Sequence, residues 1–561
     1  MDIFAICHNL TKYHGTELIF KDANLEIHNQ DRIGIVGRNG SGKTTFCNCI
    51  AGKDTEYSGK ITISSGIKIG YFRQLYRPYK EKDLQQTVFD YVLKSQTHLL
   101  DIEEELNEMM QTVATTPTPQ NLSKLGELQY IYEKNEIYSL LDRIEHALTG
   151  LGINQNGDGF RTISWDTKLH ELSGGERKIV ELATIVIKKD INLLILDEPM
   201  GHLDIHAREW MENFIKAFQG TVLVVSHDRE LLTNSVNKIL TIENQELCSY
   251  PENYTNYRKL KKEKITNIKR NWKLYEKEKN RMEKHLNEIR DWVLKSGSEK
   301  MQRLWTVEKR KYEKFINNEP INPKLFQQTF YIKNNDIKRF GHIAIRFRDF
   351  TFKFKNGQLI FNNMSTLSIN GDKVGLIGLN GTGKSTLIRI ILTKYCHDKQ
   401  ILPSTFGITD FYEEYLKQII SSDIYIGPSV SIGYFDQQHQ NIPEQQTIED
   451  YLFKLGYTDK GKLYGIMRQY SLEKGVEHKL IRDLSGGEKA RIQLITIENQ
   501  NPNLLLLDEP VNHLDIDDKE VVHEFLRNFK GNLITISHDR YLLKNVVNKY
   551  WKIMENGIIE K

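Results

Sequence analysis

The chain has 561 residues, of which 39% are hydrophobic and 27% charged, and its formal net charge is +3. This length exceeds one ordinary hydrophobic core, so several domains are expected. No run of about 18 apolar residues is present, which argues against a transmembrane helix. The opening residues, MDIFAICHNL, lack the layout of a signal peptide. Five scattered cysteines and histidines without zinc-like spacing favour free thiols over a metal site, so we expect a cytoplasmic protein.

An internal repeat organises the chain. IGIVGRNGSGKTT at 33–45 returns 341 residues later as VGLIGLNGTGKST at 374–386. Four further motifs recur in the same order: GYFRQ (70–74) as GYFDQ (433–437), LSGGE (172–176 and 484–488), LLILDEP (193–199) as LLLLDEP (504–510), and SHDR (226–229 and 537–540). Apolar runs before the phosphate loops and before the DE pairs indicate buried parallel strands. We therefore predict two α/β cassettes, at 1–257 and 339–561, joined by a connector at 258–338.

The two halves differ by an insertion each. The first has about fifty extra residues near 80–150. They predict two helices, roughly Thr87–Val113 and Asn121–Thr149, separated by TTPTP, whose prolines cannot continue a helix. The second half has an insertion near 396–428, to which the sequence gives no role.

The connector concentrates positive charge. Residues 258–338 contain 23 Lys and Arg against 11 Asp and Glu, a net +12, so the rest of the chain sums to −9. Charges recur at helical spacing from Arg258 to Leu294 and again from Glu299 to Asn317, with a break at KSGS between them. This pattern predicts an antiparallel helical hairpin. A solvated spacer is the plain alternative, but one-signed charge interleaved with tryptophan favours RNA contact, with a predicted tip of Trp292, Lys295, Lys300, Arg303 and Trp305.

GxxxxGK[ST] occurs twice, each time between a predicted strand and a helix. The glycines let backbone amides surround phosphates, the lysine neutralises them, and the following hydroxyl can ligate Mg²⁺. The predicted ATP-binding residues are Gly37, Arg38, Asn39, Gly40, Ser41, Gly42, Lys43, Thr44 and Thr45 in the first loop and Gly378, Leu379, Asn380, Gly381, Thr382, Gly383, Lys384, Ser385 and Thr386 in the second.

Acidic residues end the LLILD and LLLLD strands, at the sheet edge where nucleotides bind. The first carboxylate of each DE pair can hold Mg²⁺, the second can polarise an attacking water, and the histidine of SHDR can reach the γ-phosphate. The predicted catalytic residues are Glu198, Glu509, His227 and His538, and the predicted Mg²⁺ ligands are Thr44, Gln74, Asp197, Ser385, Gln437 and Asp508, with Gln74 and Gln437 also counted among the ATP contacts.

Two further patterns complete the predicted site. Tyr13 and Phe354 precede the phosphate loops by 24 residues and can stack on a base, with ordinary strand packing as the alternative. LSGGE opens a helix with a serine cap and two glycines, which is a second anion-binding cluster of amides. It fits two cassettes that close face to face over ATP, through Ser173, Gly174, Gly175, Glu176, Ser485, Gly486, Gly487 and Glu488.

These motifs, in this order, resemble an ATP-binding cassette protein, and the tandem cassettes with a charged helical connector resemble the ABC-F subfamily. The resemblance implies an ATPase that uses ATP and Mg²⁺ and is a monomer with its cassettes paired head to tail. In that pairing Ser485 and Gly487 complete the site on Lys43, and Ser173 and Gly175 complete the site on Lys384.

The resemblance also implies a partner, the 70S ribosome, bound near the tRNA exit site. The connector hairpin would reach toward the peptidyl-transferase centre, against 23S rRNA and the P-site tRNA, and the 80–150 insertion, or arm, would touch the L1 stalk region. Members of the subfamily act as translation factors or protect ribosomes from antibiotics.

One departure from the family pattern is present. The family has Thr-Asn-His-Leu-Asp after LDEP, and the second cassette nearly keeps it as Val511-Asn512-His513-Leu514-Asp515. The first cassette has Met200-Gly201-His202-Leu203-Asp204 instead. The missing asparagine puts equal activity of the two ATP sites in doubt.

The leading functional hypothesis is a ribosome-binding ATPase whose hairpin is presented in the ATP state and released on hydrolysis, with ribosome protection favoured slightly over a housekeeping translation role. The alternative from another class is the ATPase component of a membrane transporter, which leaves the hairpin unexplained. A DNA-repair ATPase would carry zinc modules or very long coiled coils, and the sequence has neither.

Overall fold

The structure is a computed structural model that describes residues 3–73, 79, 81–154, 163–201, 203–320, 341–355, 357–378, 381–420, 422–437, 439–470, 472, 475–512, 514–554 and 557–560. Contacts divide it into a unit that holds both cassettes (Met1–Pro251 with Phe330–Lys561) and a second unit, Glu252–Thr329. The predicted fold class, two tandem α/β cassettes, is confirmed. The domain limits proposed from the sequence stay predictions.

Each cassette combines a small antiparallel sheet with a larger, mainly parallel one, in the same strand order. In the first cassette the sheets are β2-β1-β4 and β11-β10-β3-β9-β8-β5, and in the second β13-β12-β15 and β20-β19-β14-β18-β17-β16. The strands of the first cassette are β1 (Ile3–His14), β2 (Glu17–His28), β3 (Arg32–Val36), β4 (Ser58–Ile63), β5 (Ile69–Phe72), β8 (Leu193–Asp197), β9 (Thr221–Val225), β10 (Lys238–Glu243) and β11 (Glu246–Tyr250), with a separate pair β6 (Ile153–Asn154) and β7 (Ile163–Ser164). Those of the second are β12 (Ile343–Lys353), β13 (Leu359–Ile369), β14 (Lys373–Ile377), β15 (Asp423–Ile426), β16 (Ile432–Phe435), β17 (Leu504–Asp508), β18 (Asn532–Ile536), β19 (Lys549–Met554) and β20 (Gly557–Glu560).

The helices follow the repeat as well. In the first cassette they are α1 (Lys43–Ile50), α2 (Val88–Lys94), α3 (Thr97–Thr115), α4 (Pro119–Lys134), α5 (Leu140–Gly150), α6 (Gly174–Val186), α7 (Ile205–Ala217) and α8 (Arg229–Ser235). In the second they are α11 (Lys384–Lys399), α12 (Thr409–Ile419), α13 (Ile448–Lys454), α14 (Lys460–Gln469), α15 (Gly486–Gln500), α16 (Ile516–Asn528) and α17 (Arg540–Val546). Short 3₁₀ turns lie between several of them.

Strands β8 and β17 explain why the acidic residues stand where they do. Every residue of both strands is buried, and each strand is paired in parallel on both sides, β8 with β5 and β9, and β17 with β16 and β18. Strands of this kind are continuous apolar runs because both faces of the sheet are covered. The first polar residue after four leucine or isoleucine positions is therefore at the carboxyl edge of the sheet.

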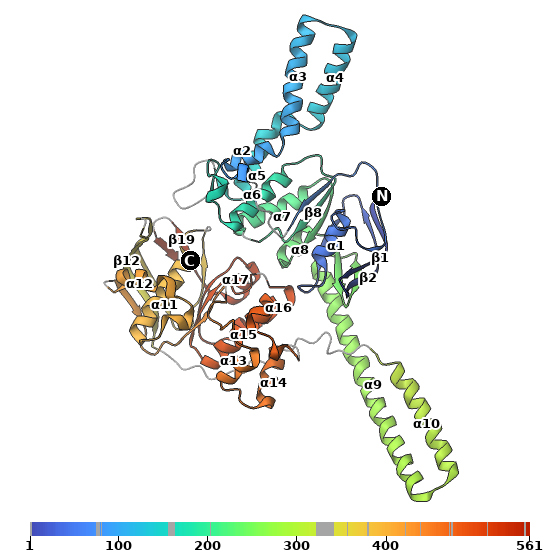
Figure 1. Cartoon of the computed structure of the whole chain (residues 1–561). Coiled ribbons are helices and arrows are strands. Elements are labelled where there is room, and N and C mark those ends of the chain that lie inside the picture. The colour runs from blue at the N-terminus through green and yellow to red at the C-terminus, as the bar shows by residue number, and fades with distance from the viewer. Residues whose placement is uncertain are drawn as a thin grey trace. The chain divides into compact units, whose positions relative to one another are not determined.

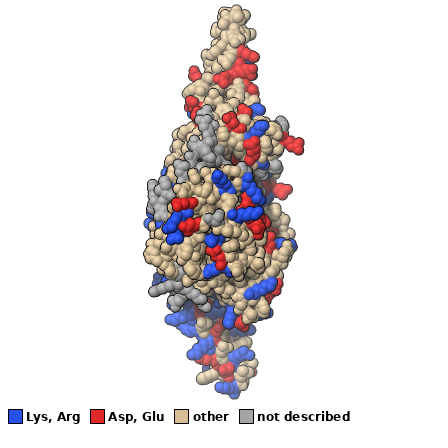
Figure 2. Space-filling view, turned by 90° about the vertical axis from the view of Figure 1, so that its left-hand side faces the viewer, with Lys and Arg blue, Asp and Glu red and all other residues tan. Residues whose placement is uncertain are grey.

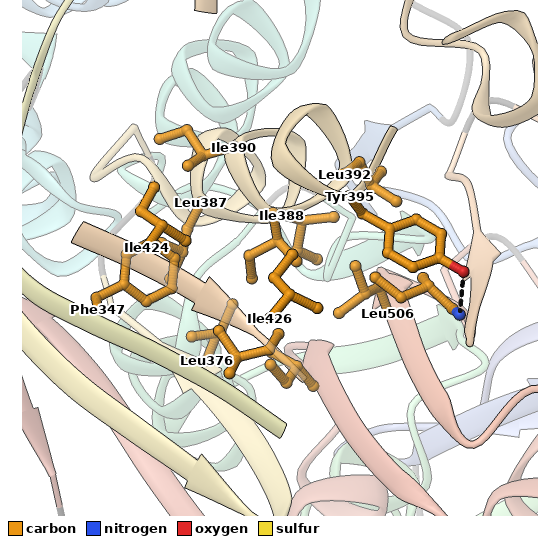
Figure 3. Packing of buried hydrophobic residues seen from close by; sticks show 14 of the residues in the cluster. Phe347, Leu376, Leu387, Ile388, Ile390, Leu392, Tyr395, Ile424, Ile426 and Leu506 are labelled. Carbon is orange, nitrogen blue, oxygen red and sulfur yellow. Dashed lines mark hydrogen bonds between the residues drawn. The ribbon is translucent and has the colours of Figure 1, made fainter. Parts of the chain in front are cut away.

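The core of the second cassette lies between α11 and the two sheets (Figure 3). Leu387, Ile388 and Leu392 of α11 pack toward Leu376 and Leu506 of the parallel sheet, and all five are fully buried or nearly so. Each such side chain contributes about 1.5–3 kcal/mol through burial. The core therefore fixes the helix that follows the second phosphate loop against the strand that ends in Asp508.

The arm helices are shorter than the sequence pattern predicts. The region predicted as Thr87–Val113 is two helices, α2 and α3, because the Ser95 hydroxyl bonds back to the Val92 carbonyl at 2.6 Å and the chain turns at Gln96. The region predicted as Asn121–Thr149 is α4 and α5, separated at Glu136, whose φ of 47° is left-handed. Helix α4 also starts at Pro119, where a proline needs no partner for its missing N–H.

The insertion at 396–428 contributes a strand and a helix to the second cassette. Its strand β15 pairs with β12 as β4 pairs with β1, and its helix α12 packs on α11. Tyr415 of α12 lies 4.9 Å from the Phe352 ring, edge to face. The insertion therefore covers the small sheet of the second cassette with an additional helix.

The second unit is a hairpin of two helices, α9 (Tyr254–Ser296) and α10 (Glu299–Asn317), side by side in Figure 1. Helix α9 begins at the cap Asn253 and ends at Gly297, whose φ of 61° suits glycine. The Tyr275 ring of α9 stacks on Phe315 of α10 at 4.9 Å, and the Tyr312 hydroxyl bonds Glu283. These contacts join two helices that otherwise present mostly charged side chains (Figure 2).

We expect Phe315→Ala to loosen the hairpin and leave the cassettes unchanged, because Phe315 provides the stacked ring that holds Tyr275. Large-to-small changes of an aromatic in a core cost about 3–5 kcal/mol, and less at this partly exposed contact. Hydrogen–deuterium exchange should rise across α10 and not in β8 or β17. Leu304→Ala, at an exposed position of α10, is the matched control. Equal exchange in both variants would contradict the packing role.

Candidate ATP sites

The two phosphate loops connect β3 to α1 and β14 to α11. Lys43 Nζ donates to the carbonyl oxygens of Gly37 and Arg38, both at 2.8 Å, and Lys384 Nζ donates to the Gly378 carbonyl at 2.9 Å. Each ammonium is thus folded back over its own loop, where phosphate oxygens would bind. The predicted loop residues occupy these two turns, except Leu379 and Asn380, which lie outside the described residues.

Glycine is required at the last position of each loop. Gly42 and Gly383 have φ values of 95° and 92°, a left-handed conformation that other residues rarely adopt. A Cβ at either position would overlap the side chain of Ile19 or Ile360, respectively. The strand pair in front of each loop therefore packs directly on its backbone.

Hydroxyl and carboxylate oxygens meet at the start of each helix after the loop. Thr44 Oγ1 donates to Asp197 Oδ2 at 2.7 Å, and Ser385 Oγ donates to Asp508 Oδ1 at 3.2 Å. Oxygen donors of this kind are those that Mg²⁺ takes in proteins, so both pairs fit the ion. Gln437, the other predicted ligand of the second site, is exposed in the turn after β16, and its counterpart Gln74 lies outside the described residues.

The predicted general bases, Glu198 and Glu509, are the residues directly after Asp197 and Asp508. Glu198 and Glu509 adopt left-handed φ values of 53° and 48°, and each backbone N–H bonds to the end of the next strand, at 2.9 Å to Val225 and 3.0 Å to Ile536. Non-glycine residues in this region are strained, and such strain is typical of functional positions. Strand edges hold both carboxylates in place at the sheet.

Each glutamate faces the histidine of the SHDR motif. His227 Nε2 lies 3.6 Å from Glu198 Oε1, and His538 Nε2 lies 3.5 Å from Glu509 Oε1. Burial lowers the pKa of His227 well below its ordinary value and that of His538 to about 3. Both rings are therefore neutral, and they can donate one hydrogen bond to a phosphate oxygen or a water without carrying charge.

Burial also acts on the glutamates. It raises the pKa of Glu198 and of Glu509 to about 7, and the charge of Lys519 opposes the rise at Glu198 while that of Arg208 opposes it at Glu509. Carboxylates with a pKa near the working pH are suited to accept a proton from water. The arrangement can orient a water, receive its proton and stabilise the charge on a leaving phosphate.

The two aromatic residues differ between the cassettes. Tyr13 at the end of β1 is 53% exposed, and a base can stack on it. Phe354 is partly buried, 5.8 Å from the Phe352 ring and 6.4 Å from the ring of Tyr415. Helix α12 of the insertion therefore occupies space beside Phe354 that is open beside Tyr13, and stacking by either ring stays a prediction.

The LSGGE segments cap α6 and α15 as the sequence indicates. Ser173 and Glu176 form a reciprocal capping box, and Ser485 and Glu488 form another. Gly174, Gly175, Gly486 and Gly487 make the first turns of these helices, and a Cβ on Gly487 would overlap Asp518. Completion of each ATP site by the opposite LSGGE stays a prediction.

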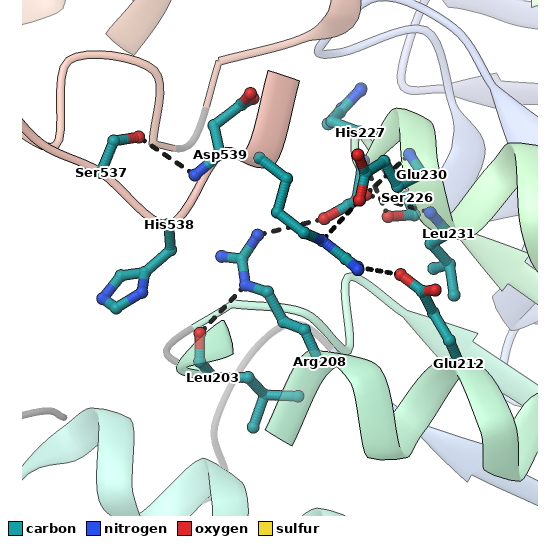
Figure 4. A network of polar contacts seen from close by, with 12 residues as sticks. Leu203, Arg208, Glu212, Ser226, His227, Glu230, Leu231, Ser537, His538 and Asp539 are labelled. Atoms are coloured by element: carbon teal, nitrogen blue, oxygen red, sulfur yellow. Dashed lines mark hydrogen bonds and ion pairs between the residues drawn. The ribbon is translucent and has the colours of Figure 1, made fainter. Parts of the chain in front are cut away.

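Contacts between the cassettes gather around these sites (Figure 4). The Asn39 N–H of the first phosphate loop donates to Asp515 Oδ2 of the second cassette at 3.3 Å. Arg540 of the second cassette pairs with Glu212, which is buried, and with Glu230 at 2.6 Å. The cassettes are therefore joined by charged groups directly beside the predicted catalytic residues.

Arg229, the equivalent arginine of the first cassette, contacts the second cassette across the same interface. Arg229 donates to the Ile516 carbonyl at 3.3 Å, lies 3.9 Å from Glu520 and stands 4.9 Å from the centre of the Tyr541 ring. Arg229 and Arg540 are the last residues of the two SHDR motifs, which the sequence shows as a repeat without showing their partners. The one sequence signal for these contacts is that an arginine recurs at the same position in both copies of the motif.

The predicted RNA tip is exposed where the hairpin turns. Trp292 is 64% exposed, and the side chain of Arg303 is 85% exposed. Lys295 and Lys300 are exposed as well, whereas Trp305 is partly buried under Lys309, whose ammonium stands 5.1 Å from the ring. The structure thus brings four of the five tip residues to the surface together.

We expect Arg540→Met to weaken the contact between the cassettes, because it leaves the buried carboxylate of Glu212 unpaired. Removing one partner of a buried pair costs about 3–5 kcal/mol. Hydrogen–deuterium exchange in α7 and α8 should rise and the unfolding midpoint should fall. Lys544→Met, at an exposed position of the same helix α17, should change neither. If both variants behave like the unmodified chain, Arg540 contributes nothing to the interface.

The chain matches known proteins along nearly its whole length. The family model described as ABC transporter matches residues 20–201 and 361–512. ATP-binding protein Uup of Escherichia coli (strain K12) is 27% identical over 560 residues, covering 98% of this chain and 81% of that protein. Energy-dependent translational throttle protein EttA of Mycobacterium tuberculosis (strain CDC 1551 / Oshkosh) is 28% identical over 537 residues, covering 95% of this chain and 88% of that protein.

Solved structures agree on the fold. One described as RNase-L Inhibitor covers 97% of this chain and 87% of its own with a TM-score of 0.55, and its 15% identity shows the fold alone. In the part of the chain that the structure describes, no helix has the length and apolar character needed to cross a membrane. The matched ranges span more than half of the chain and include both phosphate loops. The chain therefore belongs to the ABC transporter family, as an ATP-hydrolysing member of its ABC-F subfamily.

Proposed function

We propose that this ATPase binds the ribosome in its ATP-bound state, presents the hairpin tip toward the peptidyl-transferase centre, and leaves on hydrolysis. The observation that carries the proposal is the hairpin: a 43-residue helix paired with a 19-residue helix, with exposed cations and tryptophan at the turn. A cassette ATPase without another partner has no need for such a segment. The name of the relative EttA, a translational throttle protein, supports a ribosomal partner.

The chemistry of the tip favours RNA as the surface it meets. Lysine and arginine neutralise phosphates, and an exposed tryptophan can stack on an unpaired base. The tip offers both kinds of side chain close to the turn between the two helices, in Trp292, Lys295, Lys300 and Arg303. The partners that we propose are 23S rRNA and the P-site tRNA.

The arm has the opposite charge. Helix α3 carries five acidic side chains and no lysine or arginine, and red patches are visible among the tan surface at the upper end of Figure 2. Such a surface repels RNA backbone and suits a basic protein. We propose that it contacts the protein side of the L1 stalk region.

ATP and Mg²⁺ control the cycle in this proposal. Lys43 and Lys384 would hold phosphates, and Thr44 with Asp197 and Ser385 with Asp508 would hold the ion, which would neutralise charge on the phosphates. Glu198 and Glu509 orient and deprotonate the attacking water. Closure of the cassettes would last until the phosphate bond is broken.

The test of ribosome binding is the double variant Glu198→Gln, Glu509→Gln. It should bind ATP, lose hydrolysis by about 100-fold or more because proton transfer to the base is removed, and co-sediment with 70S ribosomes in ATP but not in ADP. Lys43→Ala with Lys384→Ala, which removes the phosphate contacts, is the control that should not co-sediment. An ATP-loaded double glutamine variant that stays in the supernatant would contradict the proposal.

The tip is tested by reversing its charge. Lys295, Lys300 and Arg303 changed together to Glu should weaken ribosome binding at least tenfold and flatten its salt dependence, because phosphate contacts set that slope. The charge-matched control changes Lys259, Lys262 and Lys264, exposed residues near the start of α9, to Glu. Equal losses in the two variants would show that only net charge matters.

Ribosome protection is the cellular role that we propose for this binding, with a housekeeping translation role as the alternative. Expression in a susceptible host should raise inhibitory concentrations for drugs of the peptidyl-transferase centre, such as lincosamides, pleuromutilins, streptogramins A, phenicols or macrolides. No shift for any of them would leave the translation role. Co-purification with membranes but not ribosomes would instead support the transporter alternative.

A further inference from the structure

One pair of cations lies beside the hydrolytic residues without belonging to any predicted motif. Arg208 is four residues after Asp204, and Lys519 is four residues after Asp515, so the two occupy equivalent positions on α7 and α16. The side chain of each is 12% exposed. A largely buried cation therefore lies at the same place in both halves of the repeat.

Each cation is anchored within its own cassette. Arg208 Nη1 lies 3.1 Å from Asp228 Oδ2, and its Nε donates to the Leu203 carbonyl at 3.0 Å. Lys519 Nζ lies 4.0 Å from Asp539 Oδ2. Asp228 and Asp539 are again equivalent residues of the two SHDR motifs. These anchors hold the charged groups at the edge of each cassette.

Lys519 reaches the ATP site of the opposite cassette. Its Nζ donates to the His227 carbonyl at 3.0 Å, and the ring of the same histidine lies 3.6 Å from Glu198 Oε1. Arg208 is the equivalent residue of the first cassette, and the corresponding pair in the second cassette is His538 with Glu509, whose Nε2 and Oε1 atoms lie 3.5 Å apart. Figure 4 draws Arg208 next to His538 of the other cassette.

The simpler interpretation of Lys519 and Arg208 is that they form ordinary ion pairs at the interface, as Arg229 and Arg540 do. Lys519 differs because the group that it contacts across the interface is the backbone of His227, the histidine beside Glu198, and Arg208 occupies the equivalent position in the other cassette. Their positions repeat in both directions, once in each site.

We propose that Lys519 and Arg208 are positioning residues that act in trans, each fixing the hydrolytic glutamate and histidine of the opposite cassette when the cassettes are paired. The inference rests on the proposed roles of Glu198 and Glu509 and does not depend on the ribosome. It makes hydrolysis in one site conditional on a side chain of the other cassette. Nucleotide binding, which uses the phosphate loops, is not conditional in this way.

The experiment isolates one site at a time in the full chain. Glu509→Gln leaves the site on Lys43 able to hydrolyse, and Glu198→Gln leaves the site on Lys384. Lys519→Met should lower kcat at least tenfold in the first background and less than twofold in the second, and Arg208→Met should do the reverse. KM for ATP should stay within about twofold in every case.

Two further measurements separate positioning from folding. Lys519→Arg and Arg208→Lys keep the charge and should restore kcat to within about threefold of the parent variant. Lys216→Met and Lys530→Met remove exposed cations from the same regions and serve as controls. A single glutamine variant could block both sites. In that case Lys519→Met and Arg208→Met are tested alone, by vanadate trapping of a photoreactive ATP analogue. The trapped label is mapped to the fragment that contains Lys43 or to the one that contains Lys384.

The outcomes distinguish the two levels of the proposal. Hydrolysis that survives in the double glutamine variant would overturn the roles of Glu198 and Glu509. If those roles hold, equal losses of kcat or of trapped label at both sites, or a loss that the charge-conserving variant does not restore, would overturn the trans assignment. An unchanged kcat in both backgrounds would overturn it as well.

Discussion

Carboxylates buried at the ends of hydrophobic strands are the constraint on which the rest of this structure depends. Asp197 and Asp508 end strands with no exposed residue, and a glutamate follows each of them. A buried carboxylate without a counter-charge takes up a proton. The lysine of each phosphate loop provides part of that charge, and a cation of the other cassette provides more. Cassette pairing is thereby connected to the electrostatics of both sites.

The two halves solve this problem in similar but unequal ways. Arg208 stands at one site and Lys519 at the other, and an arginine fork binds with a fixed geometry that an ammonium lacks. Phe354 has Tyr415 beside it, while Tyr13 is open. Gly201 has no side chain where Asn512 has an amide. Three differences thus lie at the sites themselves, in a chain whose sheets have the same strand order.

Much of the cassette fold follows from the sequence because its signals are local. An apolar run followed by DE places the acid at a sheet edge, and GxxxxGK between a strand and a helix places the phosphate loop. The hairpin also follows from local sequence signals, because both of its helices are free of proline and its turn contains Gly297. These features need no knowledge of distant contacts.

Other features depend on what lies across the structure. The breaks at Gln96 and Glu136 come from a hydroxyl–carbonyl bond and a left-handed residue, which charge periodicity does not show. The His227 carbonyl that accepts from Lys519 and the carboxylates that pair with Arg540 belong to the other half of the chain, hundreds of residues away. A repeat aligns equivalent positions, but it does not reveal which of them meet across an interface.

The length of α9 has a mechanical consequence. Its 43 residues span about 65 Å at 1.5 Å per residue. A rigid rod of that length converts a rotation of about 5° at its base into a displacement of about 6 Å at its end, which exceeds the rise of one helical turn. If hydrolysis releases the hairpin as proposed above, a small angular change where α9 begins would be enough to move its far end by this distance. In the proposed cycle the hairpin would act as a lever, and the stacked rings of Tyr275 and Phe315 join its two helices.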